Sequence, residues 1–207
     1  ALVRLAGIDP RASEPLPWRS CLLTCDPAGL PADVADRFPH LRQYLALRVT
    51  PAAVAELDEI LRCQVVLSVH EISGRMHTAG HLQLAGVLDQ RFAAAAGATL
   101  GPTWADRRPT LRVWAPTARR VGLLLWRGSL HEQPERLEMA ASADGTWAIT
   151  GEPDWLGAKY RFEVLVYVPE HQRLVDNHVT DPYSQALTVN STHSVLADLE
   201  APDLVPE

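Results

Sequence analysis

Short strand-like runs separated by turn residues fill the second half of the chain, and this pattern constrains the fold more than any other feature. The runs are bounded by turn signals at Gly128, Asp144-Gly145 and residues 153–157. Because no helical periodicity lies between them, they predict an antiparallel sandwich of immunoglobulin-like type. The runs cover residues 110–116, 120–126, 136–140, 146–150, 159–168, 173–179 and 194–199.

The first half has a mixed pattern. Thr50 and Pro51 open a helical pattern over residues 50–62, with Thr50 at the N-cap. Residues 63–71 and 76–84 predict the two strands of a hairpin, and a second short helix is expected over residues 87–97. Six prolines in the first forty residues argue against long regular elements there.

These patterns predict a mostly β fold with two β-sandwich-like domains, the second immunoglobulin-like, and one or two short helices in the first. The polar residues 103–110 lie between the mixed helix and strand pattern of the first half and the strand-like runs of the second, so we place a domain boundary near residue 106. The expected domains are residues 1–105 and 106–200, followed by the start of a linker at 201–207.

Charge and hydropathy narrow the possible partners. The net charge is -6 and no run of Lys and Arg is present, which argues against a nucleic-acid partner. No window reaches the ~20 apolar residues of a membrane span, so no membrane partner is expected. No signal peptide is recognisable, and both a cytoplasmic and a secreted location stay open.

Three cysteines, Cys21, Cys25 and Cys63, are too few and too unevenly spaced for a disulfide framework or a zinc set. We interpret them as ordinary thiols. A Cys21–Cys25 or Cys25–Cys63 bridge stays open for an exported protein.

The histidines near residue 70 do not match a zinc-protease helix, because Gly74 occupies the position four residues after His70. His77 and His81 are four apart, but on an extended strand they would lie ~13 Å from each other. We therefore expect no metal and no cofactor. No pair of carboxylates stands out as catalytic, so no catalytic residue is assigned in this chain.

Tryptophan is the residue type with the strongest link to a ligand, since an exposed indole can stack on the C–H face of a sugar ring and a buried one is core. Trp114 and Trp147 lie inside strand runs and are expected in the core. Trp126 and Trp155 lie beside polar turns, and for them both alternatives stay open.

Three stretches of the second half resemble the carbohydrate-binding module family 48 domain of pullulanases and limit dextrinases, which are debranching enzymes of glycoside hydrolase family 13. The stretches contain "VWAPTA" (113–118), the element W-x-G-x-x-Y (155–160) and "VTDPYSQALTVNS" (179–191). The first half resembles the β-rich domain that precedes this module, through "ADRFPHLRQYLAL", "CQVVLSVHEISGR" and "LQLAGVLDQRFAAAAGATLGPTW".

The resemblance implies that the chain is the non-catalytic N-terminal fragment of a starch or glycogen debranching enzyme. In that family a (β/α)8 barrel follows the module, and a barrel needs ~250 residues. The chain also begins without Met. We therefore expect the parent enzyme to hydrolyse α-1,6 links, this chain to be inert, and its partners to be its own barrel and α-glucan.

Glucan-binding members of the module family use two tryptophans, a basic strand residue and a polar residue in a late loop. By resemblance, Arg161 falls at the basic position and His178 near the position of the second tryptophan. The expected carbohydrate-binding residues are Trp126, Trp155, Arg161, Asn177 and His178, with the loop at 190–193 beside them.

Two alternatives to a barrel-supporting fragment remain: an autonomous α-glucan-binding module, and an interaction sandwich unrelated to sugars. The polar stretch 176–200 bears on this choice because it could be mistaken for an active site. We expect Asp181-Pro182 to form a turn there, Tyr183 and Leu187 to anchor the loop by packing, and residues 194–199 to close the sandwich.

Overall fold

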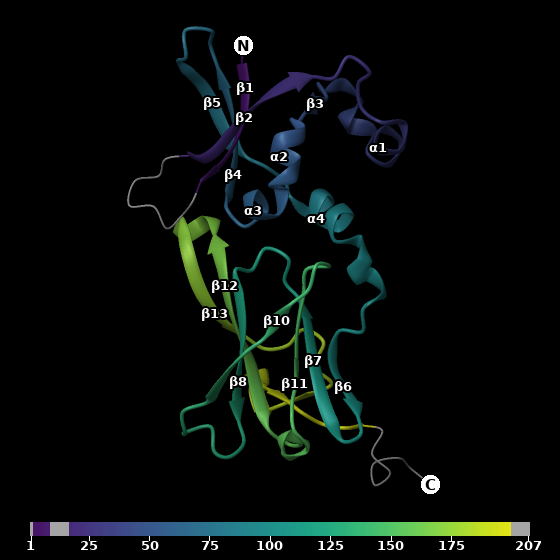
Figure 1. The fold of residues 1–207 in the computed structure, drawn as a ribbon, viewed down its shortest axis with the longest axis vertical. Coiled ribbons are helices and arrows are strands. Elements are labelled where there is room, and N and C mark those ends of the chain that lie inside the picture. Colours follow the sequence, from purple (N-terminus) through teal and green to yellow (C-terminus); the bar gives the residue numbers. More distant parts are fainter. Residues whose placement is uncertain (1, 9–16, 200–207) are drawn as a thin grey trace. The chain divides into compact units, whose positions relative to one another are not determined.

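The computed structural model describes residues 2–8 and 17–199 of the chain (Figure 1). By their internal contacts the residues divide into two compact units, 1–84 and 85–207. Each unit contains its own cluster of buried hydrophobic side chains. Each is therefore described by itself.

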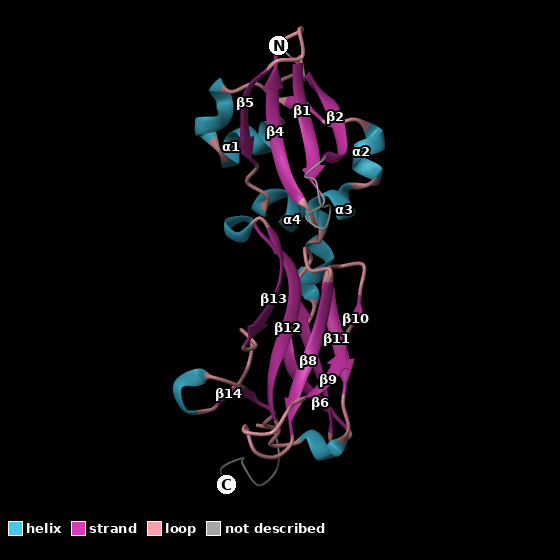
Figure 2. Cartoon of the chain, turned by 90° about the vertical axis from the view of Figure 1, so that its left-hand side faces the viewer, coloured by secondary structure: helices cyan, strands magenta, loops and turns pink. Residues whose placement is uncertain are grey.

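The first unit is built on one antiparallel sheet with the strand order β3-β2-β1-β4-β5, and Figure 2 shows its strands side by side. The predicted hairpin is confirmed as β4 and β5, with Val66 opposite His81. The strands are β1 (Leu2–Ile8), β2 (Pro17–Cys25), β3 (Leu47–Arg48), β4 (Gln64–His70) and β5 (Met76–His81).

The predicted helix at 50–62 forms as two short helices divided at Glu56. Thr50 caps the first, because its side-chain oxygen accepts from Ala53 N at 3.4 Å. Ile60 follows on the second helix and packs with Ala53 and Val65 in the core of this unit. The helices of the unit are α1 (Ala32–Arg37), the 3-10 helix η1 (Pro39–Gln43), α2 (Pro51–Ala55) and α3 (Leu57–Leu61).

The expectation of no long regular element before residue 40 is wrong for β2, which runs nine residues. Pro17 is its first residue, where a missing N–H costs least. Pro27 lies in a turn, and Pro31 directly precedes α1. These three prolines thus lie at the ends of regular elements or in a turn between them, and do not prevent the elements from forming.

The second unit is an antiparallel sandwich preceded by helix α4 (Ala85–Arg91) and the 3-10 helix η2 (Ala93–Gly97). One sheet has the order β10-β11-β7-β6. The other has the order β14-β15-β12-β8-β9, with β13 paired to β12. The first sheet contains β6 (Gly101–Ala105), β7 (Arg108–Trp114), β10 (Ala140–Ala141) and β11 (Thr146–Thr150). The second contains β8 (Arg120–Trp126), β9 (Glu135–Glu138), β12 (Lys159–Val168), β13 (Arg173–Val179), β14 (Ala186–Leu187) and β15 (Ser194–Val195).

Alternate residues of the central strands fill the sandwich. Leu111 and Val113 of β7 face Leu123 of β8 and Tyr160 and Phe162 of β12 in one buried cluster. The predicted mostly β fold is confirmed. Short 3-10 turns connect the strands: η3 (Pro153–Trp155), η4 (Pro169–His171) and η5 (Val189–Ser191).

The contact-defined division lies between residues 84 and 85, and strand β6 pairs with β7 along its whole length. A boundary near residue 106 would therefore separate two paired strands of one sheet.

Three further findings concern expectations from composition. Within the described part of the chain, no helix is long and apolar enough to cross a membrane. Cys21, Cys25 and Cys63 are free of disulfide bonds, and Cys63 is buried. The described residues contain no group of three His, Cys, Asp or Glu side chains that could hold a metal ion.

Glycine at position 145 is required by both conformation and space. Its φ is +78°, and an added Cβ would lie 2.8 Å from Pro116 Cβ and 3.1 Å from Phe92 Cδ1. Gly157 has the same φ of +78°, but an added Cβ there would have no neighbouring atom within 4 Å.

We expect Gly145→Ala to lower the free energy of unfolding by about 2–3 kcal/mol and Gly157→Ala by about 1 kcal/mol. Urea titration monitored by tryptophan fluorescence measures both, and equal losses would contradict the packing argument.

Candidate functional site

The outer face of the second sheet of the sandwich carries most of the predicted site residues. On β12, Tyr160 and Phe162 point into the core, so Arg161 and Glu163 point outward. Residues that pair directly across antiparallel strands share a face, and His178 of β13 pairs with Glu163. His178 and Arg161 therefore lie on the same outer face.

Trp126 ends strand β8 and is half-buried. Its Nε1 donates to the carbonyl oxygen of Glu132 at 3.1 Å, which fixes the indole against the loop that follows the strand. The ring of His193 meets the indole edge-on, with centroids 4.7 Å apart and an interplanar angle of 84°. The indole is thus held in one orientation by two contacts.

Arg161 connects the two histidines of this surface. Its Nη2 donates to the carbonyl oxygen of His178 at 2.6 Å, while its Nε is buried without a hydrogen-bond partner. Burial lowers the pKa of His193, and the nearby charge of Arg161 lowers it further. We refer to Trp126, Arg161, His178 and His193 as the Trp126 surface.

The imidazole of His178 is held by a buried carboxylate. His178 Nε2 lies 3.1 Å from Glu163 Oε1, which also accepts from Arg136 Nη1 at 2.7 Å. Arg120 Nη1 lies 3.6 Å from the other oxygen of Glu163. Glu163 is only 4% exposed, so its carboxylate has lost most of its hydration. The charges and hydrogen bonds of these partners offset that loss. His178 therefore belongs to a polar network, which holds its ring by Nε2 while its side chain stays 42% exposed.

Asn177 lies next to His178 on β13 and so faces the other side of the sheet. It pairs with Val164, whose side chain packs against the core. The structure thus separates Asn177 from Arg161 and His178, with which the sequence analysis had grouped it.

Trp155 is a core residue and not a stacking platform, which corrects the sequence-based expectation. It is 4% exposed and lies in the main hydrophobic cluster. Its indole lies so close to Gly151 that a Cβ there would be 2.2 Å from Trp155 Cε3. Trp155 lies in η3, which begins two residues after Gly151. A tryptophan beside a polar turn gives no signal of this close approach.

The loop between β14 and β15 positions His193. Thr188 Oγ1 accepts from His193 N at 3.0 Å and closes the loop at its base. At its tip, Asn190 and Ser191 have φ values of +61° and +54°. Left-handed backbone at non-glycine residues costs free energy and is often found at functional sites. Val189 beside them is 86% exposed.

Asp181 is the anchor of the polar stretch 176–200. It is 3% exposed and accepts from the Tyr160 hydroxyl and from Tyr183 N, each at 2.8 Å. Its own N–H donates to Ser194 Oγ at 2.9 Å. The expectation that Tyr183 and Leu187 anchor the loop by packing is wrong, since they are 45% and 48% exposed. Hydrogen bonds to Asp181 hold the loop instead.

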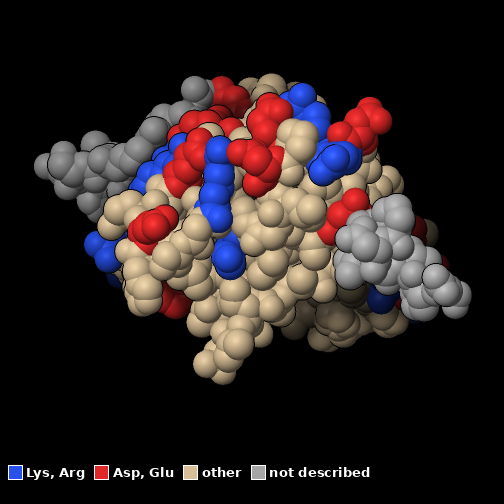
Figure 3. All heavy atoms as spheres, turned by 90° about the horizontal axis from the view of Figure 1, so that it is seen from below, with Lys and Arg blue, Asp and Glu red and all other residues tan. Residues whose placement is uncertain are grey.

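On the face seen in Figure 3, Lys and Arg side chains stand among Asp and Glu side chains. The described residues on that face form no separate basic patch. The ion pairs agree with this mixture: Arg127 lies 2.8 Å from Glu135 and 2.9 Å from Asp154.

Both units match known protein families. Residues 6–90 match the pullulanase N2 domain, and residues 99–184 match carbohydrate-binding module 48 (isoamylase N-terminal domain). The chain is 35% identical to a pullulanase of Klebsiella pneumoniae and 30% identical to pullulanase 1, chloroplastic, of Arabidopsis thaliana, with 89% of the chain covered in each case. The chain has the N-terminal domain pair of pullulanases.

A solved structure of Klebsiella pneumoniae pullulanase complexed with maltotriose resembles the chain with a TM-score of 0.87 at 32% identity, covering 100% of this chain. The matched part is 20% of that protein, and 17% and 19% of the two relatives above. The chain therefore spans about a fifth of the length of the pullulanases that it matches, and corresponds to their N-terminal domains.

Sequence reasoning missed the residues that support the module's outer face. Glu163 holds His178, and Arg136 and Arg120 neutralise Glu163. Strand alternation could have placed Glu163 beside Arg161 on the outer face. Arg136 and Arg120 come from two other strands, β9 and β8, and only strand order brings them to this carboxylate.

Asp181 and Asp144 of the pullulanase-type module should give opposite pH dependences. Burial raises the pKa of Asp181 above its value in the unfolded chain. Its charged form therefore opposes folding, and the free energy of unfolding falls as the pH rises above the pKa that Asp181 has in the unfolded chain. Hydrogen bonds from Thr146 N and Oγ1 lower the pKa of Asp144, so its contribution is present above the unfolded value and is lost as pH falls.

We compare the free energy of unfolding of each variant with that of the unsubstituted chain. As the pH rises from about 3 to about 7, we expect this difference to shift in favour of Asp181→Asn and against Asp144→Asn. Denaturant titrations at several pH values measure the difference in the free energy of unfolding. Parallel pH profiles for the two variants would contradict the assigned environments.

Proposed function

We propose that this chain is the non-catalytic N-terminal region of a debranching enzyme that hydrolyses α-1,6-glucosidic links in starch, glycogen or pullulan. The sequence-based division gives residues 1–105 to the N-terminal β-rich domain, residues 106–200 to the module, and residues 201–207, which lie outside the described residues, to the start of a linker to a (β/α)8 barrel. We propose this order of parts with the module beginning no later than β6, because β6 pairs with β7. The observation that carries the proposal is the match, over 89% of the chain in sequence and 100% in fold, to a part that makes up about a fifth of the length of pullulanases.

The main role of the region is to support the barrel, which is its partner in the intact enzyme. The polar character of the Trp126 surface favours this role over strong glucan binding. By resemblance, His178 falls near the position where glucan-binding relatives carry a second tryptophan, and its Nε2 lies 3.1 Å from Glu163 Oε1. Loss of one aromatic platform weakens carbohydrate affinity by about 1 kcal/mol.

A second candidate function is glucan binding by the module itself. Trp126 offers a half-exposed indole that His193 meets edge-on, and Arg161 lies near enough to His193 for its charge to lower the pKa of that imidazole. An indole can stack on the C–H face of a glucose ring while guanidinium N–H groups donate to its hydroxyls. This arrangement supports weak binding through Trp126 and Arg161, with Asn177 and Trp155 outside the contact surface.

The first experiment measures hydrolysis. We expect the purified chain to release no reducing sugar from pullulan, because in this proposal the catalytic carboxylates belong to the barrel. The Klebsiella pneumoniae pullulanase serves as the positive control. Release at enzyme-like rates would overturn the proposal.

Sequencing the gene past the codon for Glu207 tests the proposed activity of the parent enzyme. A downstream domain other than a (β/α)8 barrel would contradict that activity.

The second experiment measures binding of maltoheptaose and β-cyclodextrin by calorimetry. We expect a weak interaction whose Kd rises about fivefold to tenfold in Trp126→Ala. Leu130→Ala is the matched control, because Leu130 is an exposed apolar residue in the loop that follows Trp126. A flat titration of the parent at millimolar ligand would remove glucan binding and leave the barrel-supporting role.

A further inference from the structure

Lys159, the only lysine of the chain, lies beside the indole of Trp126. It begins strand β12, and its direct partner on β8 is Trp126. Because Tyr160 after Lys159 and Leu125 before Trp126 lie in the core, Lys159 and Trp126 both point to the outer face of the sheet. Directly paired residues have Cβ atoms about 5 Å apart. The lysine side chain is therefore an immediate neighbour of the indole on this face.

Arg161 is the next residue of β12 on the same face, about 7 Å along the strand. Its Nε is buried and its Nη2 donates to the carbonyl oxygen of His178 at 2.6 Å, which leaves Nη1 for a ligand. Burial, and then the charge of Arg161, lower the pKa of His193. Since the ring of His193 meets the indole of Trp126 at 4.7 Å, the positive charge of Arg161 acts close to the indole.

These two cations have no carboxylate partner among the described residues. The one carboxylate that shares their face on β12, Glu163, already lies 2.7 Å from Arg136 and 3.6 Å from Arg120. By contrast, ion pairs with carboxylates are formed by Arg42, Arg48, Arg62, Arg75, Arg108, Arg120, Arg127 and Arg136. Lys159 and Arg161 therefore place positive charge beside the indole without a carboxylate to neutralise it in this part of the chain.

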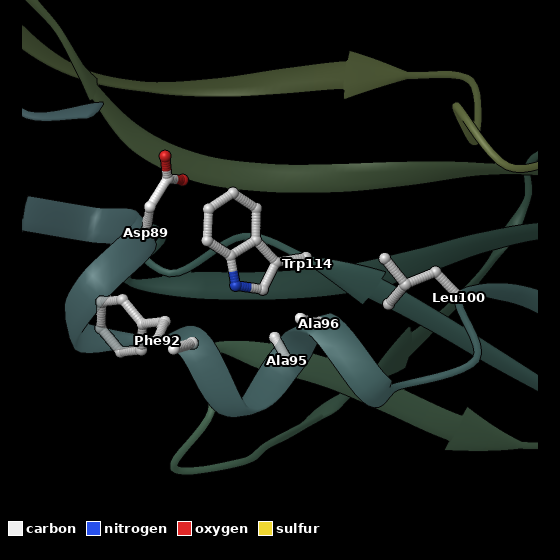
Figure 4. A pocket seen from close by; sticks show the side chains of 7 residues that line it. Asp89, Phe92, Ala95, Ala96, Leu100 and Trp114 are labelled. Carbon is white, nitrogen blue, oxygen red and sulfur yellow. The ribbon is translucent and has the colours of Figure 1, made fainter. Parts of the chain in front are cut away.

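Trp114 provides a comparison within the same sandwich. It lies on the other sheet, where Figure 4 shows its ring among Asp89, Phe92, Ala95, Ala96 and Leu100. The pocket there, of about 370 Å³, has no Lys or Arg side chain in its lining. An anionic group would find no cation in that pocket, and Asp89 would repel it. Of these two indoles, only that of Trp126 can form part of a site for an anionic sugar.

We propose that the Trp126 surface prefers an α-glucan that carries a phosphate monoester, whose phosphate is held by Lys159 and Arg161. A glucose ring stacks on the indole, and the phosphate accepts hydrogen bonds from the Lys159 ammonium and from Arg161 Nη1. A phosphate monoester carries a charge of about −1.5 to −2 at pH 7, so it supplies the anion that these two cations lack. The inference rests on glucan binding by the module, the second candidate function of this chain, and names the class of glucan.

The test compares maltoheptaose with maltoheptaose that carries one phosphate at O6, by calorimetric titration of the whole chain. At low salt we expect the Kd of the phosphorylated ligand to be about tenfold lower, because hydrogen bonds to charged groups are stronger than those to neutral groups. Raising the ionic strength from about 20 mM to about 300 mM should reduce the ratio of the two Kd values to about twofold, since salt screens exposed charges.

Two variants locate the preference. Lys159→Gln should lower the ratio of the two Kd values from about tenfold to about threefold or less. The matched control is Arg173→Gln, which removes one positive charge from the exposed start of β13 in the same sheet. It should leave the ratio at about tenfold. An equal fall in both variants would reflect net charge alone and would overturn the proposal.

Equal Kd values for the two ligands in the unsubstituted chain would overturn the phosphate preference and leave glucan binding in place. If neither ligand binds, glucan binding by the module fails and the preference fails with it, while the barrel-supporting role stands. Glucose 6-phosphate and inorganic phosphate are the remaining probes. Binding of either one as tight as that of the phosphorylated maltoheptaose would identify an anion site without glucan recognition and would overturn the proposal.

Discussion

Strand β12 is the constraint on which the rest of the second unit depends. Its inward residues Tyr160 and Phe162 are fully buried, and β8, β13 and β15 all pair with it. Burying two aromatic side chains contributes several kcal/mol, and a shift of one residue would turn Arg161 and Glu163 into the core. The register of this strand therefore determines both what fills the sandwich and which side chains its outer face presents.

The same strand couples the core to the polar end of the module. The Tyr160 hydroxyl donates to Asp181, whose main chain is held by Ser194. A buried hydroxyl and a buried carboxylate satisfy each other here, so neither is left unpaired in the interior. The loop that follows carries His193 to Trp126. The stretch whose composition suggested an active site is consequently a structural support for a surface, with its carboxylate buried beneath it.

Local chemistry explains what could be predicted. Alternating apolar residues marked the strands of the sandwich, Thr50 and Pro51 marked the start of a helix, and the motifs around Trp155 and Asp181 carried the family resemblance. Strand alternation placed Arg161 and Glu163 on one face of β12. His178 joined them on that face because it pairs with Glu163. Strand alternation along residues 173–179 could also have separated Asn177 from His178. Trp155 could not be assigned in this way, because its burial depends on the approach of Gly151.

The sequence by itself determined the class of fold, the positions of most strands of the sandwich, and the resemblance of both halves to pullulanase-type domains. These follow from residue spacing and turn chemistry, which act over a few neighbours along the chain. Only the tertiary structure decided that Trp155 is buried against Gly151 and that Glu163 holds His178. Those outcomes depend on contacts between residues that strand order and loop closure bring together, and no local pattern records them.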